Sequence, residues 1–119
     1  IFCRRHHAGQ PLTVFGDGRA TRDYLFVGDV VDAIYRLLNT PEANKVYNLG
    51  TGIETSVNGL IDELQRVSDR SAQVHHADAR HGEVARSALD AQNAWSTFDW
   101  RAQTGLAKGI TITYSELNR

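Results

Sequence analysis

The stretch GDGRATRDYLFVGDV (residues 16–30) places a turn, an extended segment and the start of a helix in direct succession. Gly16 to Gly18 has the glycine and aspartate composition of a tight turn. Residues 21–27 are predicted to be extended, and Asp29 is predicted to cap a helix that starts there. The apolar side chains that follow recur at helical spacing and predict one buried face: Val30, Val31, Ile34, Leu37 and Leu38.

Elements on both sides of this stretch continue the alternation of helix and strand. Before it, residues 1–8 are predicted to end a helix at Gly9, and residues 12–15 to form a short strand. After it, residues 45–49 are predicted to be a buried strand of a parallel sheet. Ser56 is a natural N-cap. It precedes a second amphipathic helix with Val57, Leu60, Ile61, Leu64 and Val67 on its apolar face.

The last third of the chain is less clearly patterned. Residues 73–76 are predicted to be a strand and residues 90–96 a short helix. Thr104 can cap a final helix, although the β-branched alternation of residues 110–114 also suits a strand. This alternation of strands and helices indicates an α/β fold class.

Composition excludes several classes of protein. The chain has 119 residues, 41% of them hydrophobic, so it is globular rather than disordered. Its formal net charge of −1 argues against a nucleic-acid-binding protein. The cluster RRHH at residues 4–7 is interpreted as a solvated helix end. No apolar run approaches the roughly 20 residues of a membrane span.

Cys3 is the single cysteine, so no disulfide can form within the chain, which fits a reducing, cytoplasmic location. There is no signal peptide pattern. The first residue is Ile1 rather than Met, inside a predicted helix, and we therefore expect the chain to be a fragment of a longer protein.

Eight segments, in their order and spacing, resemble one family. They are LTVFGDG (12–18), TRDY (21–24), VGDVVDA (27–33), VYNLGTG (46–52), ETSV (54–57), RHGEVARSALD (80–90), FDW (98–100) and TGLAKGI (104–110). They resemble the extended short-chain dehydrogenase/reductase enzymes of the NAD-dependent epimerase/dehydratase family. The RHGEVARSALD portion is most similar to bacterial UDP-glucose 4-epimerases. The resemblance implies that residues 1–119 are the C-terminal nucleotide-sugar-binding region, with late sheet elements of a Rossmann domain whose NAD-binding part lies upstream.

The resemblance also implies a binding site for the nucleotide. Arg22 and Arg80 match the family's ligands of the diphosphate, and a guanidinium fork suits that group. Glu83 matches the acceptor of hydrogen bonds from the ribose hydroxyls, because a carboxylate can accept from both oxygens of a diol. The alternatives are ion pairs, of Arg22 with Asp23 and of Arg80 with Glu83. The family pattern has a proline where this chain has His81, which leaves the shape of this loop open.

Three further positions follow from the same resemblance. Thr13 and Phe15 match the strand that borders the uracil ring, although Phe15 can equally be a core aromatic. Ser87 matches the position beside the carbon-2 substituent of the sugar. A small residue there leaves room for an acetamido group, unless the neighbouring Arg86 closes the space.

Two motifs of the family are not in this chain. It lacks the glycine-rich turn that binds the NAD pyrophosphate, and it lacks the Tyr-x-x-x-Lys pair that supplies the catalytic tyrosine. We therefore assign no catalytic and no cofactor-binding residue to the chain. We also expect no metal site, because His75 and His76 are adjacent in a strand and point to opposite faces. His81 and Asp78 complete no standard zinc spacing with them.

The functional prediction is the UDP-sugar-binding part of an NAD-dependent UDP-glucose/UDP-N-acetylglucosamine 4-epimerase, inactive by itself. Two other enzymes stay open, a dTDP-glucose 4,6-dehydratase and a UDP-glucuronate decarboxylase. An alternative of another class is a non-catalytic sugar-nucleotide-binding protein. We expect a UDP-sugar as the partner, with no nucleic acid and no membrane, and a homodimer of the whole enzyme.

Overall fold

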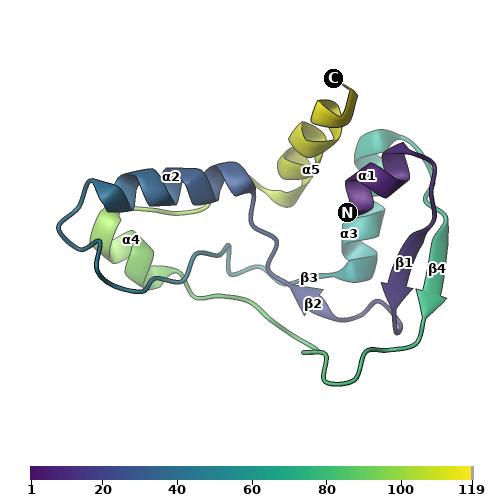
Figure 1. Ribbon diagram of the computed structural model, residues 1–119, viewed down its shortest axis with the longest axis horizontal. Coiled ribbons are helices and arrows are strands. Elements are labelled where there is room, and N and C mark those ends of the chain that lie inside the picture. The colour runs from purple at the N-terminus through teal and green to yellow at the C-terminus, as the bar shows by residue number, and fades with distance from the viewer. Residues whose placement is uncertain (119) are drawn as a thin grey trace.

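A computed structural model describes residues 1–118 and shows an elongated α/β chain with two lobes (Figure 1). Its radius of gyration is 16.2 Å, against roughly 13–14 Å for a compact domain of this length. The elements in chain order are α1 (Phe2–His7), β1 (Leu12–Phe15), β2 (Thr21–Arg22), α2 (Val27–Leu38), β3 (Thr55–Ser56), α3 (Val57–Ser68), β4 (Val74–Ala77), α4 (Gln92–Phe98), α5 (Leu106–Ser115) and the 3-10 helix η1 (Glu116–Asn118).

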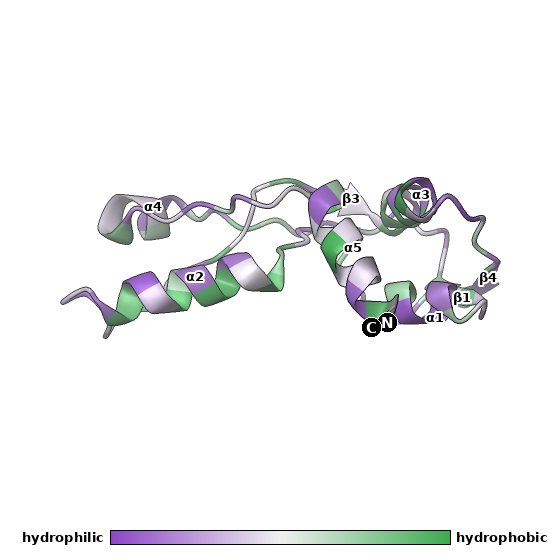
Figure 2. Cartoon of the chain, turned by 90° about the horizontal axis from the view of Figure 1, so that it is seen from above, coloured by the Kyte–Doolittle hydropathy of each residue, from purple (hydrophilic) through white to green (hydrophobic). Residues whose placement is uncertain are grey.

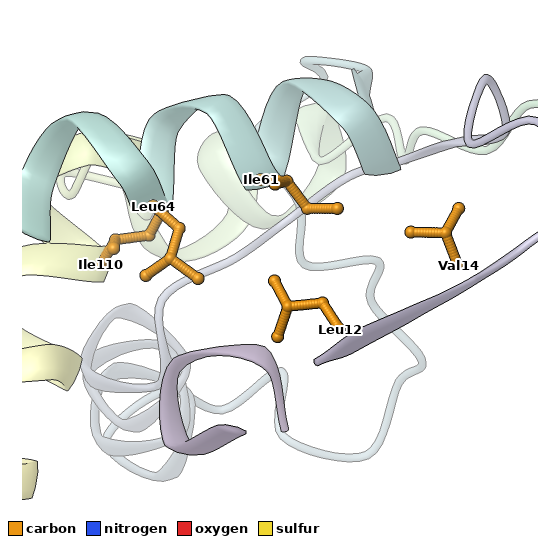
Figure 3. Close-up of a cluster of buried hydrophobic side chains, with 5 residues drawn as sticks. All are labelled: Leu12, Val14, Ile61, Leu64 and Ile110. Carbon is orange, nitrogen blue, oxygen red and sulfur yellow. The ribbon is translucent and has the colours of Figure 1, made fainter. Parts of the chain in front are cut away.

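One lobe combines a two-stranded parallel ribbon, β1 and β4, with α1, α3 and α5. Its core contains Leu12 and Val14 from β1, Ile61 and Leu64 from α3, and Ile110 from α5 (Figure 3). These side chains are at most 6% exposed. Burying a side chain of this size contributes about 1.5–3 kcal/mol, so this cluster holds the ribbon against the helices.

The other lobe packs α2 against α4 and the segment that follows α4. Its core contains Ala33, Ala94, Phe98 and Trp100. Tyr47 meets the ring of Phe98 edge-on, with 5.1 Å between the ring centroids. The indole nitrogen of Trp100 donates to the carbonyl oxygen of Asp29 at 2.9 Å, so the buried indole leaves no unpaired donor.

A short antiparallel pair lies between the lobes. Thr21 and Arg22 of β2 pair with Ser56 and Thr55 of β3, respectively. Strand β3 was not expected from the sequence, because two residues are too few to show alternation. The pair brings the segment that follows the Gly16–Gly18 turn beside the start of α3.

Most of the predicted elements are confirmed. Helix α1 ends before Gly9, whose φ is +67°, and β1 matches its predicted bounds. The hydroxyl of Ser56 caps α3 by accepting from the amide of Gly59 at 2.9 Å. Strand β4 begins one residue later than expected and α4 two residues later. The open choice at residues 110–114 is settled, because they lie in helix α5.

The predicted roles of Asp29 and Thr104 as helix caps are wrong. Helix α2 begins at Val27, so Asp29 lies inside its first turn and is buried. Its carboxylate accepts from the amide of Thr104 at 2.9 Å and from the hydroxyl of Thr104 at 3.1 Å. The two side chains bind each other instead of capping a helix, and this contact joins the start of α2 to the residues just before α5.

The predicted strand at residues 45–49 is also wrong for the described part of the chain. These residues are in no helix or strand, and Val46 is 96% exposed. A strand requires a hydrogen-bonded neighbour, and among residues 1–118 no strand pairs with this segment.

The apolar face predicted for α2 is only partly buried. Leu37 packs on the Ala33 core, whereas Val31, Ile34 and Leu38 are 60%, 51% and 73% exposed. Figure 2 shows the reason, because α4 lies on one side of α2 and no described element lies on the other.

His6 differs from the expectation that residues 4–7 form a solvated helix end. It is buried, and its two ring nitrogens lie 3.2 Å from the hydroxyl of Tyr114 and 3.2 Å from the carbonyl oxygen of Arg70. Burial of a polar ring is tolerated here because both nitrogens have partners.

Among residues 1–118, none of the helices combines the length and the apolar character that a membrane span requires.

Candidate functional site

The candidate site lies where β1 and β4 end. Leu12 and Val14 point into the core, so Thr13 and Phe15 face the opposite side of the ribbon. Phe15 is 37% exposed. Because β1 and β4 are parallel, the segments that follow them leave the ribbon at the same edge. The Gly16–Gly18 turn and the segment after β4 therefore lie next to each other.

The Gly16–Gly18 turn is held against α3 and β4. Gly16 and Gly18 have φ angles of +69° and +74°, which glycine adopts without strain. A Cβ on Gly18 would lie 2.1 Å from the Oδ1 of Asn58. The Asn58 amide donates to the carbonyl of Asp17 at 3.0 Å, and the Nδ1 of His76 lies 2.8 Å from the carbonyl of Gly16. These contacts define the shape of the turn.

Residues 79–86 form the other wall. The guanidinium of Arg80 lies over the ring of Phe15, 3.8 Å from its centroid. Between the two walls is a cleft of about 390 Å³. Its lining residues come from the turn, from β1 and from this wall: Phe15, Gly16, Asp17, Arg19, Ala20, Ala79, Arg80, Glu83, Ala85 and Arg86. Three arginines and two carboxylates make this lining net cationic, which suits an anionic ligand.

Arg22 lies at the edge of this cleft. It donates to the carbonyl oxygens of Thr21 and Val84 at 2.7 Å each, and to the carboxylate of Glu83 at 3.3 Å. Its side chain is 34% exposed, so the guanidinium is accessible while its position is constrained. Five N–H donors in one plane allow these contacts together.

The structure brings together four of the six predicted site residues. Phe15, Arg80 and Glu83 line the cleft, and Arg22 contacts it through Glu83. Thr13 and Ser87 are half-buried and are not among the lining residues.

The ion pairs considered as alternatives have different partners from those proposed. The carboxylate of Glu83 pairs with Arg22 rather than with Arg80, whose cation stacks on Phe15. The carboxylate of Asp23 accepts from backbone amides instead of pairing with Arg22. Phe15 is at the surface of the ribbon rather than in the core.

Asp23 is the polar residue that the sequence analysis missed. Its carboxylate accepts from the amide and hydroxyl of Thr51, from the amide of Gly52 at 2.9 Å and from the amide of Leu89 at 3.2 Å. Burial alone would raise the pKa of Asp23, but hydrogen bonds from Thr51, Leu89 and Gly52 outweigh it and leave the pKa lowered. The only sequence signal was an acidic residue beside Arg22, which also fits a surface carboxylate.

A larger hollow, of about 580 Å³, lies in the other lobe between residues 50–52, residues 88–92 and Trp95. There the guanidinium of Arg101 stacks over the Trp95 ring at 3.4 Å. This hollow contains none of the predicted site residues.

Within residues 1–118, no group of three His, Cys, Asp or Glu side chains could hold a metal ion. The cleft beside Phe15 is the better candidate because its lining includes three arginines and two carboxylates.

Comparison with known proteins identifies relatives along most of the chain. The model of the NAD dependent epimerase/dehydratase family matches residues 1–50. The UDP-glucose 4-epimerase of Mycolicibacterium smegmatis is 37% identical over 113 residues, which are 95% of this chain and 36% of that protein. A dTDP-glucose 4,6-dehydratase of Xanthomonas campestris is 31% identical over 116 residues, covering 89% of this chain and 33% of that protein.

Solved structures agree with the sequence relatives. The UDP-glucose 4-epimerase of Thermotoga maritima, crystallised with UDP-glucose, matches with a TM-score of 0.92 and 32% identity, over 99% of this chain and 38% of that one. The Thermus thermophilus UDP-glucose 4-epimerase complex with NAD matches with a TM-score of 0.89 and 29% identity, over 99% and 39%. The chain spans about a third of the length of the curated relatives it matches.

The α/β fold and these relatives support an extended short-chain dehydrogenase/reductase of the NAD-dependent epimerase/dehydratase family. The chain corresponds to a part of these proteins, consistent with their C-terminal portion.

Proposed function

We propose that residues 1–119 are the nucleotide-sugar-binding region of an NAD-dependent UDP-glucose 4-epimerase. The proposal is supported mainly by the cleft that Arg80, Glu83 and Phe15 line, with Arg22 at its edge. Calorimetric titration of the whole protein with UDP tests the binding step, and conversion of UDP-glucose to UDP-galactose tests the reaction. A protein that binds no UDP would refute the proposal.

In this proposal Arg22 and Arg80 bind the diphosphate. Arg22 contacts Glu83, Arg80 lines the same cleft, and the two arginines come from different segments, so they can approach a diphosphate from two sides. Guanidinium groups form directed, charge-assisted hydrogen bonds with phosphate oxygens. The constrained position of Arg22 reduces the conformational entropy lost on binding.

The nucleoside is assigned to the wall formed by β1. Phe15 offers an exposed ring and lies on the same face of the ribbon as Thr13. Aromatic side chains supply a large, rigid contact area for a base. Glu83 would accept hydrogen bonds from the ribose hydroxyls, because its carboxylate has acceptor capacity beyond its contact with Arg22.

The reaction itself depends on groups outside this chain. NAD, bound by residues outside this chain, would supply the hydride chemistry at carbon 4 of the sugar. The catalytic tyrosine and its lysine partner lie outside these residues, as does the NAD-binding turn. The task of this region is to anchor the nucleotide while the sugar rotates. We further propose a cytoplasmic homodimer for the whole enzyme.

A second enzyme function is supported by one finding. The Xanthomonas campestris dTDP-glucose 4,6-dehydratase is 31% identical over 116 residues, so a dehydratase sharing the Arg22 region is the runner-up. A UDP-glucuronate decarboxylase is the third enzyme candidate. Product analysis with each sugar nucleotide separates the three. The alternative from another class is a non-catalytic binder, and a whole protein that binds UDP without turning over any of these sugars would establish it.

We expect residues 1–119 alone to have no epimerase activity and no measurable NAD affinity. The physical reason is that the residues for hydride transfer and for the NAD pyrophosphate are not in this sequence. Incubation of the purified chain with UDP-glucose and NAD, followed by chromatography for UDP-galactose, checks the first point. Turnover that persists after repurification would contradict it.

We also expect the whole enzyme to accept UDP-N-acetylglucosamine, because Ser87 is small. In the Ser87→Tyr variant, activity on the acetylated sugar should fall selectively, since overpacking costs about 1–3 kcal/mol, or roughly 5- to 150-fold. The measurement is kcat/KM on both sugars. Equal losses on both sugars, or no activity of the unmodified enzyme on the acetylated one, would remove Ser87 as the gate. Arg86, which lines the cleft, would then be the next residue to vary.

A further inference from the structure

The segment at residues 80–89 lies in no helix or strand, although it carries Arg80, Glu83 and Ser87, three of the six predicted site residues. Its position depends on individual contacts. The amide of Thr21 donates to the carbonyl of Ala85 at 2.9 Å, and Arg22 donates to the carbonyl of Val84 at 2.7 Å. Gly82 has φ +76°, and a Cβ on it would meet no atom within 4 Å. No side chain therefore packs against the segment on that side of Gly82.

A further contact restrains this segment from the loop before β3. The guanidinium of Arg86 donates to both carboxylate oxygens of Glu54, from Nε and from Nη2, at 2.9 Å each. This is the bidentate arrangement that gives an ion pair a defined geometry. Arg86 lines the cleft, and its side chain is 79% exposed, whereas that of Glu54 is only 28% exposed.

Glu54 also contacts β2. The hydroxyl of Thr21 donates to the Oε2 of Glu54 at 2.6 Å. One carboxylate thus joins β2, the loop before β3 and the segment that carries Arg80 and Glu83. Hydrogen bonds from Arg86 and from Thr21 lower the pKa of Glu54, so the carboxylate stays ionised at neutral pH.

From this geometry we infer that Glu54 is a positioning residue, which acts through Arg86 to hold the segment at residues 80–89 in the geometry that binds the nucleotide diphosphate. The inference rests on the proposed function. It assigns a role to a residue outside the cleft lining, and it gives Arg86 a task other than direct contact with the ligand.

The physical consequence is a separation between stability and affinity. An exposed ion pair contributes little to the free energy of unfolding. When a segment without secondary structure loses one of its restraining contacts, more of it must be ordered when the ligand binds, and this ordering lowers affinity. We therefore expect Glu54→Gln and Arg86→Ala each to weaken UDP binding about 3- to 10-fold. The thermal midpoint should stay within a few degrees of that of the unmodified protein.

The experiment uses the whole protein and two readouts. Calorimetric titration with UDP gives affinity, and native-state hydrogen exchange of the Thr21 amide reports whether the segment stays attached without ligand. The double variant should be no weaker than either single one, because both remove the same contact. The charge-swapped pair, Glu54→Arg with Arg86→Glu, should recover part of the affinity. The matched control is Glu63→Gln, which removes the exposed Glu63–Arg66 pair of α3 and should leave both readouts unchanged.

Several outcomes would overturn the inference while the proposed function stands. They are unchanged UDP affinity in Glu54→Gln, additive losses in the double variant, and tighter binding in Glu54→Gln. Tighter binding would mean that a released Arg86 contacts the ligand directly. If the unmodified protein binds no UDP, the proposed function fails. Hydrogen exchange then still tests whether the Glu54–Arg86 pair restrains residues 80–89. Unchanged protection of the Thr21 amide in both single variants would refute that restraint.

Discussion

Replacement of Arg22 by alanine should weaken UDP binding by the whole protein about 10- to 100-fold, which corresponds to roughly 1.5–3 kcal/mol. The guanidinium of Arg22, which belongs to β2, donates to the carboxylate of Glu83 and to the carbonyl oxygens of Thr21 and Val84, and these contacts constrain its position. Losing it removes charge-assisted hydrogen bonds to the diphosphate. Arg80→Ala should have a similar effect, and the affinity for NAD should change little in either variant. Calorimetric titration with UDP and, separately, with NAD measures both.

Two companion variants make this test specific. Arg22→Lys keeps the charge without the planar fork, so it should recover only part of the affinity. Arg66→Ala removes an exposed arginine of α3 that pairs with Glu63, and it should leave UDP affinity unchanged. An Arg22→Ala protein that binds UDP as tightly as the unmodified one would refute the assignment of Arg22 to the diphosphate.

The second large effect is expected at Asp23. Asp23→Ala should lower the free energy of unfolding by about 1.5–3 kcal/mol, because three backbone amides lose a charged acceptor. Those donors are on Thr51, Gly52 and Leu89, which belong to two loops that this carboxylate holds together. Urea unfolding of the whole protein, followed by circular dichroism, measures the change.

The dependence on pH tests the same carboxylate. Because the pKa of Asp23 is lowered on folding, its contribution to stability is fully present above the ordinary value of roughly 3.9. It is lost as the pH falls through the lower value of the folded protein. The stability difference between the unmodified protein and Asp23→Asn should therefore shrink in acid. A difference that stays constant down to pH 2 would exclude an ionised Asp23 as the cause.

Local patterns were sufficient for a large part of the fold. The Gly16–Gly18 turn and the Ser56 cap of α3 depend on neighbouring residues in the chain, and each is where it was predicted. Strand β1 also has its predicted bounds, although it is completed by pairing with β4. The choice at residues 110–114 was different, because β-branched residues favour a strand locally. Packing of Ile110 against Leu12 and Leu64 accompanies the helix there, which shows tertiary context overriding propensity.

The candidate site divides in the same way. The family resemblance indicated Arg22, Arg80, Glu83 and Phe15, and the structure places them together at one cleft. Their actual partners did not follow from the resemblance. Glu83 pairs with Arg22 across 61 positions of sequence, and Arg80 stacks on Phe15. Distances between such distant residues depend on how β1 and β4 pair.

By itself, the sequence determined the α/β class, the order of most elements, the family resemblance and the residue types available for a nucleotide diphosphate. Only the tertiary structure decided which carboxylate serves which partner: Asp23 for the loops at Thr51 and Leu89, Asp29 for Thr104, and Glu54 for Arg86. The physical reason is range. Turns, caps and helix periodicity arise from contacts a few residues apart, whereas a carboxylate binds whichever donors the fold brings within about 3 Å of it.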